Sequence, residues 1–124
     1  METGSRPQLR ITSVTIGAPD PGALAEFYAQ LLGGEVGVSE PGWTQVRTET
    51  LTLNVEHERH WVTPTWPAAA DRQVATQHLD IRVDDLEAAE QWALDCGARL
   101  APVQPQSDVR VLIDPVGHPF CLFR

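Results

Sequence analysis

An alternating strand that runs into a capped helix occurs twice in this chain of 124 residues. The first copy begins at Ser13 and reaches its helix start at Asp20, and the second runs from His78 to Asp85 with the same spacing of 7 positions. Side chains of a strand alternate between two faces, whereas a helix buries every third or fourth residue. Because a chain of this length normally forms one domain, the repeat predicts a single domain built from two similar modules.

The first module is predicted to contain one strand, one helix and three further strands. Residues 9–17 alternate as a strand does, and Asp20 and Pro21 then suit the N-cap and the first turn of a helix. The glycine pair Gly33–Gly34 predicts the end of that helix. Three short strands are expected at 35–38, 43–47 and 51–56.

The second module repeats this order. Residues 78–83 predict a strand, and either Asp84 or Asp85 caps the following helix, with Glu87 placed for a capping box if Asp84 is the cap. Gly97 ends the helix. Its buried stripe is expected to comprise Leu86, Ala89, Trp92, Ala93 and Cys96. The closing strands are expected at 99–101, 108–113 and 119–123, so that both modules have the order βαβββ.

The modules are separated by an irregular segment. We expect a flexible lead-in at 1–8, a first module at about 9–57, a linker at 58–74 and a second module at 75–124. The linker is rich in proline and contains two tryptophans. These tryptophans have three interpretations: a lid over a pocket, a contact between subunits, or an anchor that holds the loop to the body.

The charge and the cysteine content restrict the partners and the compartment. The net charge is −8, and all nine basic residues are arginines, which argues against nucleic acid and anionic membranes as partners. No apolar run approaches the roughly 18 residues of a membrane span, and the N-terminus has no apolar signal core. Two cysteines make no disulfide framework, so we expect a cytoplasmic protein with free thiols.

Two motifs carry a resemblance to a known family. Residues 75–86 read ATQHLDIRVDDL, and residues 114–123 read DPVGHPFCLF, in which Pro115 and Gly117 suit a tight turn before a strand. Over about residues 9–124 the chain resembles the glyoxalase-like and bleomycin-resistance-like domains of the vicinal-oxygen-chelate (VOC) superfamily. The resemblance implies an α+β fold in which two βαβββ modules form an eight-stranded mixed sheet around a ligand cleft.

The same resemblance implies an assembly and a set of metal positions. Family members commonly form homodimers, and the cleft is completed either within one chain or across the subunit contact. Metal-dependent members use a His or Gln on the first strand of each module and a Glu on the last. The matching positions in this chain are Ser13, either Asn54 or Glu56, His78 and Cys121.

This set departs from a typical oxygen-chelating metal site. Cys121 and Glu56 each lie 36 positions beyond the helix caps Asp85 and Asp20, but a shift of two residues selects Asn54 on the same strand face. A serine hydroxyl is a poor ligand, since such sites are built from imidazole and carboxylate. A divalent metal is therefore not favoured and no cofactor is assigned, although His78, a glutamate and a cysteine are all zinc ligands.

Further residues are expected to line the cleft. Trp43, Gln45 and Arg47 share one strand face, which either lines the cleft or is an ordinary outward edge face. The cleft is favoured, because Val46 on the opposite face suits the core better. An aromatic wall, an amide and a guanidinium suit a planar or anionic small molecule. On the second module Asp80 lies beside His78 by the same alternation.

Three functions are compatible with these residues, and the third is a specialised biosynthetic or regulatory partner without chemistry of its own. The first is a small-molecule binding protein that holds an organic ligand in the cleft, with Cys121 as a packed, unreactive thiol. The alternative is a lyase, isomerase or dioxygenase-like enzyme, either metal-assisted or with His78 and a carboxylate, Glu56 or Asp80, as an acid–base pair. The sequence leaves open whether the protein is an enzyme.

Overall fold

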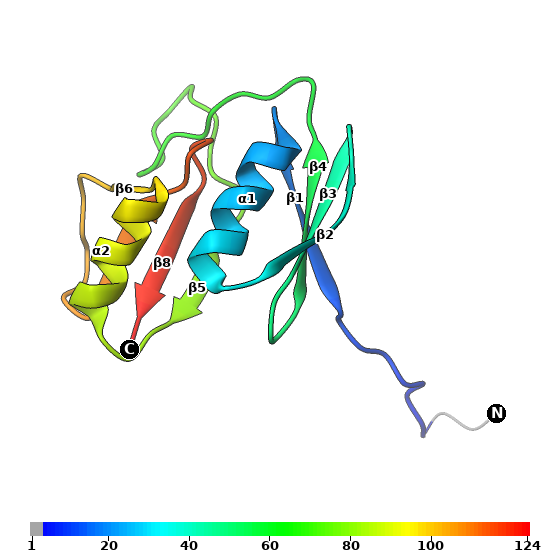
Figure 1. Ribbon diagram of the computed structural model, residues 1–124. Helices are drawn as coiled ribbons and strands as arrows, with labels where there is room; N and C mark the ends of the chain where they lie inside the picture. The colour runs from blue at the N-terminus through cyan, green and yellow to red at the C-terminus, as the bar shows by residue number, and fades with distance from the viewer. Residues whose placement is uncertain (1–3) are drawn as a thin grey trace.

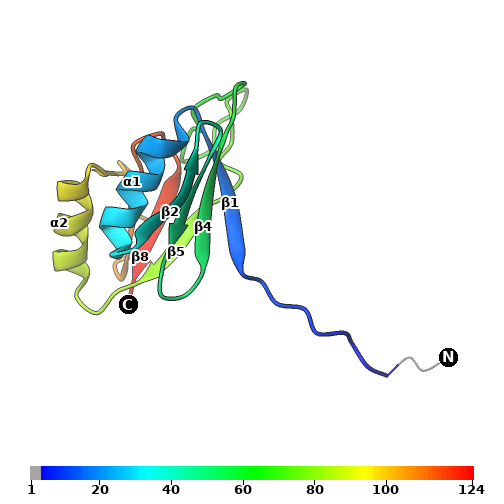
Figure 2. The ribbon, with the colours of Figure 1, turned by 45° about the vertical axis from the view of Figure 1, so that its right-hand side comes forward.

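A computed structural model describes residues 4–124 (Figure 1). Of the predicted lead-in, residues 1–3 lie outside the described part, and residues 4–12 form neither helix nor strand. The Thr12 carbonyl still accepts a hydrogen bond from the Thr52 N–H, and the described chain before it extends away from the body (Figure 2). The first strand therefore begins at Ser13, later than the predicted residue 9. Neither helix of the described residues has the length and apolarity needed to cross a membrane.

The first module forms one four-stranded sheet with one helix. In chain order its elements are β1 (Ser13–Ala18), α1 (Pro21–Leu32), β2 (Glu35–Glu40), β3 (Trp43–Arg47) and β4 (Thr52–His57). The strand order is β1-β4-β3-β2, with β1 parallel to β4. Helix α1 begins as predicted, because the Asp20 carboxylate accepts a hydrogen bond of 3.2 Å from the Ala23 N–H. It ends at Gly33, whose φ of 67° favours glycine.

The second module repeats this arrangement. Its elements are β5 (Leu79–Arg82), α2 (Leu86–Cys96), β6 (Arg99–Leu100), β7 (Val109–Ile113) and β8 (Pro119–Phe123), with strand order β5-β8-β7-β6. Asp85 is the N-cap and accepts a hydrogen bond of 3.0 Å from the Ala88 N–H, so the alternative cap at Asp84 is wrong. Trp92 was expected in the buried stripe, but it is 46% exposed and its indole N–H donates to the Leu31 carbonyl.

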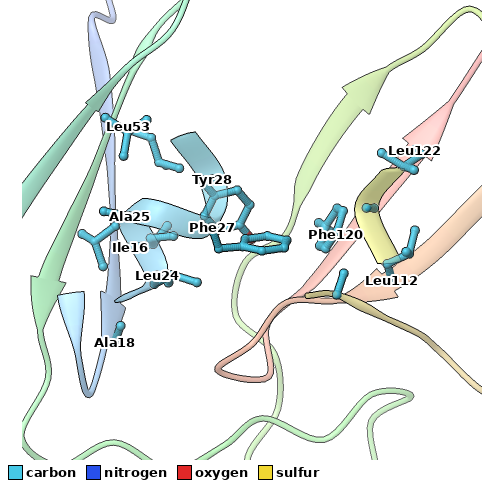
Figure 3. Close-up of a cluster of buried hydrophobic side chains, with 14 of the residues drawn as sticks. Ile16, Ala18, Leu24, Ala25, Phe27, Tyr28, Leu53, Leu112, Phe120 and Leu122 are labelled. Atoms are coloured by element: carbon cyan, nitrogen blue, oxygen red, sulfur yellow. The ribbon is translucent and has the colours of Figure 1, made fainter. Parts of the chain in front are cut away.

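The α+β fold with two βαβββ modules is confirmed, and its eight strands are divided between two separate sheets. Helix α1 lies between the sheets (Figure 1), and its Phe27 and Tyr28 reach across to Phe120 on β8 (Figure 3). The Phe27 and Tyr28 rings lie 6.0 and 6.2 Å from the Phe120 ring in edge-to-face geometry. Because these rings fill the space between the sheets, one continuous eight-stranded sheet does not form within a single chain. The face of each sheet that is turned away from the shared core is called its outer face below.

A buried polar contact accompanies this aromatic contact. The Tyr28 hydroxyl donates a 2.6 Å hydrogen bond to Asp114 Oδ2, and Asp114 Oδ1 accepts three backbone N–H groups of residues 116–118 at 3.0 Å each. In the same turn the buried His118 donates from Nε2 to the Gly17 carbonyl of β1 at 3.0 Å. The turn before β8 therefore attaches the second module to both α1 and β1 of the first.

Tyr28 is the only tyrosine of the chain, so its ionisation can be observed directly. Burial raises its pKa well above the ordinary value of 10.0, and the neighbouring Asp114 carboxylate raises it further. The folded state thus keeps a proton that the unfolded chain loses above about pH 10, and folding stability is lost as the pH rises through that range. We expect tyrosinate absorbance to appear only well above pH 10 and together with the loss of circular dichroism. Tyrosinate absorbance near pH 10 with unchanged circular dichroism would contradict the buried contact.

The Asp114 carboxylate offers a second test of the same contact. We expect Asp114→Ala to lower the free energy of unfolding by about 3 kcal/mol or more, because it leaves a buried hydroxyl and several backbone N–H groups without an acceptor. Asp114→Asn keeps one oxygen for the backbone groups and should cost only about 1 kcal/mol. Urea unfolding of both variants measures the difference, and equal costs would show that the backbone hydrogen bonds do not matter.

Candidate functional site

The predicted first-module residues lie together on the outer face of the first sheet. Strand register places Gln45 of β3 opposite Asn54 of β4, and Trp43 opposite Glu56. The alternate residues of the same strands, such as the fully buried Val46, face α1 and the core. Trp43, Gln45 and Arg47 therefore lie on the face of the first sheet that is turned away from the core, and their role in lining a ligand cleft stays a prediction.

A glycine in β2 provides room for two of these side chains. A Cβ at Gly37 would lie 2.6 Å from Gln45 Oε1 and 3.2 Å from Arg47 Cζ. The amide and the guanidinium consequently extend across the sheet over Gly37. Arg47 is exposed and forms no ion pair within residues 4–124. Its charge is available to an anionic group.

Asn54 lies near the centre of this face. It is only 8% exposed, and its Nδ2 lies 3.5 Å from the Thr15 hydroxyl. Its Oδ1 is buried and accepts no hydrogen bond within the described residues. An unpaired buried oxygen is costly, so this atom marks a position for a hydrogen-bond donor. Glu56, two positions along the same strand, is exposed instead.

The outer face of the second sheet carries a different group. Asp80 of β5 stands directly opposite Cys121 of β8, and His78 precedes it on the same face. Their ligand atoms all lie within 4.8 Å of one another, and His78 Nε2 lies 3.2 Å from Asp80 Oδ1. Burial raises the pKa of the Cys121 thiol, and the Asp80 charge raises it further. This disfavours a free thiolate, as expected for a thiol that is not a nucleophile.

Trp66 from the segment between the modules packs beside this group. It contacts a small apolar cluster on the second sheet, together with Cys121. The buried members of that cluster are Ala101, Val111 and Ile113. The sequence left the role of this tryptophan among three alternatives, because a tryptophan in a proline-rich loop has no periodic pattern that assigns it to a face.

One copy of the chain does not bring the two groups together. Ser13 and Glu56 belong to the first sheet, and His78 and Cys121 belong to the second, with α1 between the sheets. The four positions expected from the resemblance therefore do not converge within one chain, and Ser13 contributes only a neutral hydroxyl. These residues do not fit a typical four-ligand oxygen-chelating metal site.

Two cavities of the described residues lie elsewhere. The larger, about 450 Å³, lies between the loop that joins β3 to β4 and strand β5, and Asp80 is the only candidate residue that lines it. The second, about 410 Å³, is lined by His118, Trp61 and the start of the segment between the modules. The outer face of the first sheet is thus an open surface in one copy, and another surface is needed to enclose a ligand there.

Similarity to known proteins agrees with this fold. The glyoxalase-like domain model matches residues 13–123. A glyoxalase family protein from Enterococcus faecalis is 21% identical with a TM-score of 0.69, and the match covers 93% of this chain and 97% of that one. Lactoylglutathione lyase from Agrobacterium tumefaciens is 14% identical with a TM-score of 0.65, covering 95% of each chain. The fosfomycin resistance protein FosX from Mesorhizobium loti is 12% identical with a TM-score of 0.66, covering 95% and 92%.

At such identities these structures share only the fold, and their names show that one fold serves different chemistries. No curated protein matches the sequence. The domain model, in contrast, spans nearly the whole chain. The chain therefore belongs to the glyoxalase-like family of the VOC superfamily.

Proposed function

We propose that the protein binds a small, planar organic anion on the outer face of the first sheet. The observation that carries this proposal is the placement of Gln45 and Arg47 over Gly37. The unpaired oxygen of Asn54, opposite Gln45, accepts a hydrogen bond from a donor group of the same ligand. A guanidinium binds carboxylate-like groups through paired hydrogen bonds, and the amide adds a further donor. Trp43 supplies an aromatic surface for a planar ligand.

A second copy of the chain would enclose this surface. Strands β1 and β5 are both edge strands, so β1 of one copy can pair with β5 of another and join two sheets into one. The backbone carbonyls of Thr12 and Ala18 accept hydrogen bonds from Thr52 and Glu58, on the side of β4. Because carbonyls alternate in direction along a strand, those of Ser13 and Thr15 point to the free edge of β1. In such a homodimer the outer face of the first sheet continues into the second-sheet face that carries His78. We propose a cytoplasmic location, which the two free cysteines support.

A second candidate function is acid–base catalysis, which the short contact between His78 and Asp80 favours. In the homodimer Glu56 of one copy would approach this pair. An enzyme of this kind would lose turnover in both His78→Ala and Asp80→Asn and still bind its ligand through Arg47.

The anion site can be tested with naphthoate, a planar aromatic carboxylate. We expect calorimetric titration to show binding that weakens about 10-fold or more in Arg47→Ala, because a charge-assisted hydrogen bond is lost. Gly37→Ala should also weaken binding, since its Cβ displaces Gln45 and Arg47 without removing a polar group. Arg99→Ala on β6 removes an exposed arginine of the other sheet and serves as the matched control. Equal affinity in Arg47→Ala and Arg99→Ala would refute the site.

The homodimer can be tested at the edge of β5. The Val83 N–H donates to the Phe123 carbonyl of β8, so the neighbouring Arg82 N–H points to the free edge of β5. A proline at position 82 therefore removes no hydrogen bond within a single copy of the chain. We expect sedimentation velocity to show a dimer for wild type and Arg82→Ala and a monomer for Arg82→Pro, with circular dichroism unchanged. A wild-type monomer, or a dimer that survives Arg82→Pro, would contradict pairing through this edge.

A further inference from the structure

We propose that His78, Asp80 and Cys121 form a zinc site contained within the second module of a single copy. This set replaces the family's arrangement of ligands from both modules. It includes Asp80, which does not match a family ligand position, and omits Ser13, Asn54 and Glu56. The inference does not depend on the proposed binding of an organic anion or on dimer formation.

The backbone places these three ligands suitably for one metal ion. His78 and Asp80 are two positions apart, so their side chains leave the same face of the sheet, and Cys121 is the direct partner of Asp80 on β8. Imidazole, carboxylate and thiolate are all zinc ligands. Tetrahedral bonds of about 2.0–2.3 Å place ligand atoms roughly 3.3–3.8 Å apart, so atoms within 4.8 Å need to close by only about 1 Å.

The side chains can make this adjustment. His78 and Asp80 have 53% and 59% of their side-chain surface exposed, so both rotate without disturbing the core. The 3.2 Å contact between His78 Nε2 and Asp80 Oδ1 already directs a nitrogen and an oxygen toward one point. A zinc ion bound there takes the place of any proton between these two atoms.

The surroundings of the sulfur favour a retained metal. Cys121 packs with Trp66 against the buried residues Val111 and Ile113, so one side of the site is apolar. A hydrophobic wall of this kind limits solvent access and strengthens the attraction between the ion and the thiolate. The opposite side is open to solvent, so a water molecule or a donor atom of a ligand completes the fourth position.

The ligand chemistry determines the selectivity. A thiolate is a soft ligand that prefers Zn²⁺ or Co²⁺ to Mg²⁺ or Mn²⁺. Binding forms a bond between the metal and Sγ of Cys121, and the proton of the thiol is released to solvent. No oxidant or reductant takes part.

Cobalt titration of the chelator-treated protein tests the site, because a cobalt–thiolate bond has its own charge-transfer absorbance in the near ultraviolet. We expect one Co²⁺ per chain, displaced by Zn²⁺ and not by Mg²⁺. The absorbance should vanish in Cys121→Ser and persist in Cys96→Ser, which removes the other free thiol and is the matched control. Asp80→Asn and His78→Ala should each weaken the affinity about 10-fold or more.

Four outcomes would overturn the proposal. They are a Co²⁺ spectrum without thiolate absorbance, absorbance that is lost in Cys96→Ser, equal affinity for Zn²⁺ and Mn²⁺, or a loss of affinity in Glu56→Gln as large as that in Asp80→Asn. The last result would show a metal shared between the two sheets. Cys121→Ala, checked by circular dichroism, separates loss of the ligand from loss of the fold. Since all three ligands lie in one copy, monomeric Arg82→Pro should keep the site even if the anion-binding proposal fails.

Discussion

The packing of α1 against Phe120 joins the two modules through aromatic rings that come from both of them. Phe27 and Tyr28 of the first module lie edge to face with this ring of the second module, inside a core that both sheets share. The Tyr28 hydroxyl adds a buried hydrogen bond to Asp114. A carboxylate in an apolar core is tolerated only when its acceptor sites are filled, and here the backbone of residues 116–118 fills the remaining ones. The contact therefore holds the modules in one relative position.

That position decides what each sheet presents to solvent. With α1 in the space between the sheets, the outer face of the first sheet carries Arg47, Gln45 and Asn54, and that of the second carries His78, Asp80 and Cys121. The first face suits an anion and the second suits a cation. The two chemistries meet only if a second copy joins the free edges of β1 and β5, so assembly and ligand binding are linked in the function we propose.

Much of the local structure could be predicted because short-range physics determines it. Asp20 caps α1 and Gly33 ends it, since a side-chain acceptor and a left-handed residue are needed at those two places. The choice of Asp85 over Asp84 and the exposure of Trp92 were not predictable. The cap is decided by which aspartate side chain reaches the Ala88 N–H, whereas the exposure of Trp92 accompanies the hydrogen bond from its indole N–H to the carbonyl of Leu31 in the other module.

The two βαβββ modules, and the residues that share a strand face, could be predicted from the amino-acid sequence, because alternation, caps and glycine ends act over a few residues. Its motifs also indicated the family, whereas the candidate site residues stay a prediction. The tertiary structure adds that these faces belong to two separate sheets, that Trp66 covers part of the second, and that Cys121 of β8 lies beside His78 and Asp80. These features depend on contacts between residues far apart in the chain, such as Tyr28 with Asp114, and therefore cannot be predicted from a local sequence pattern.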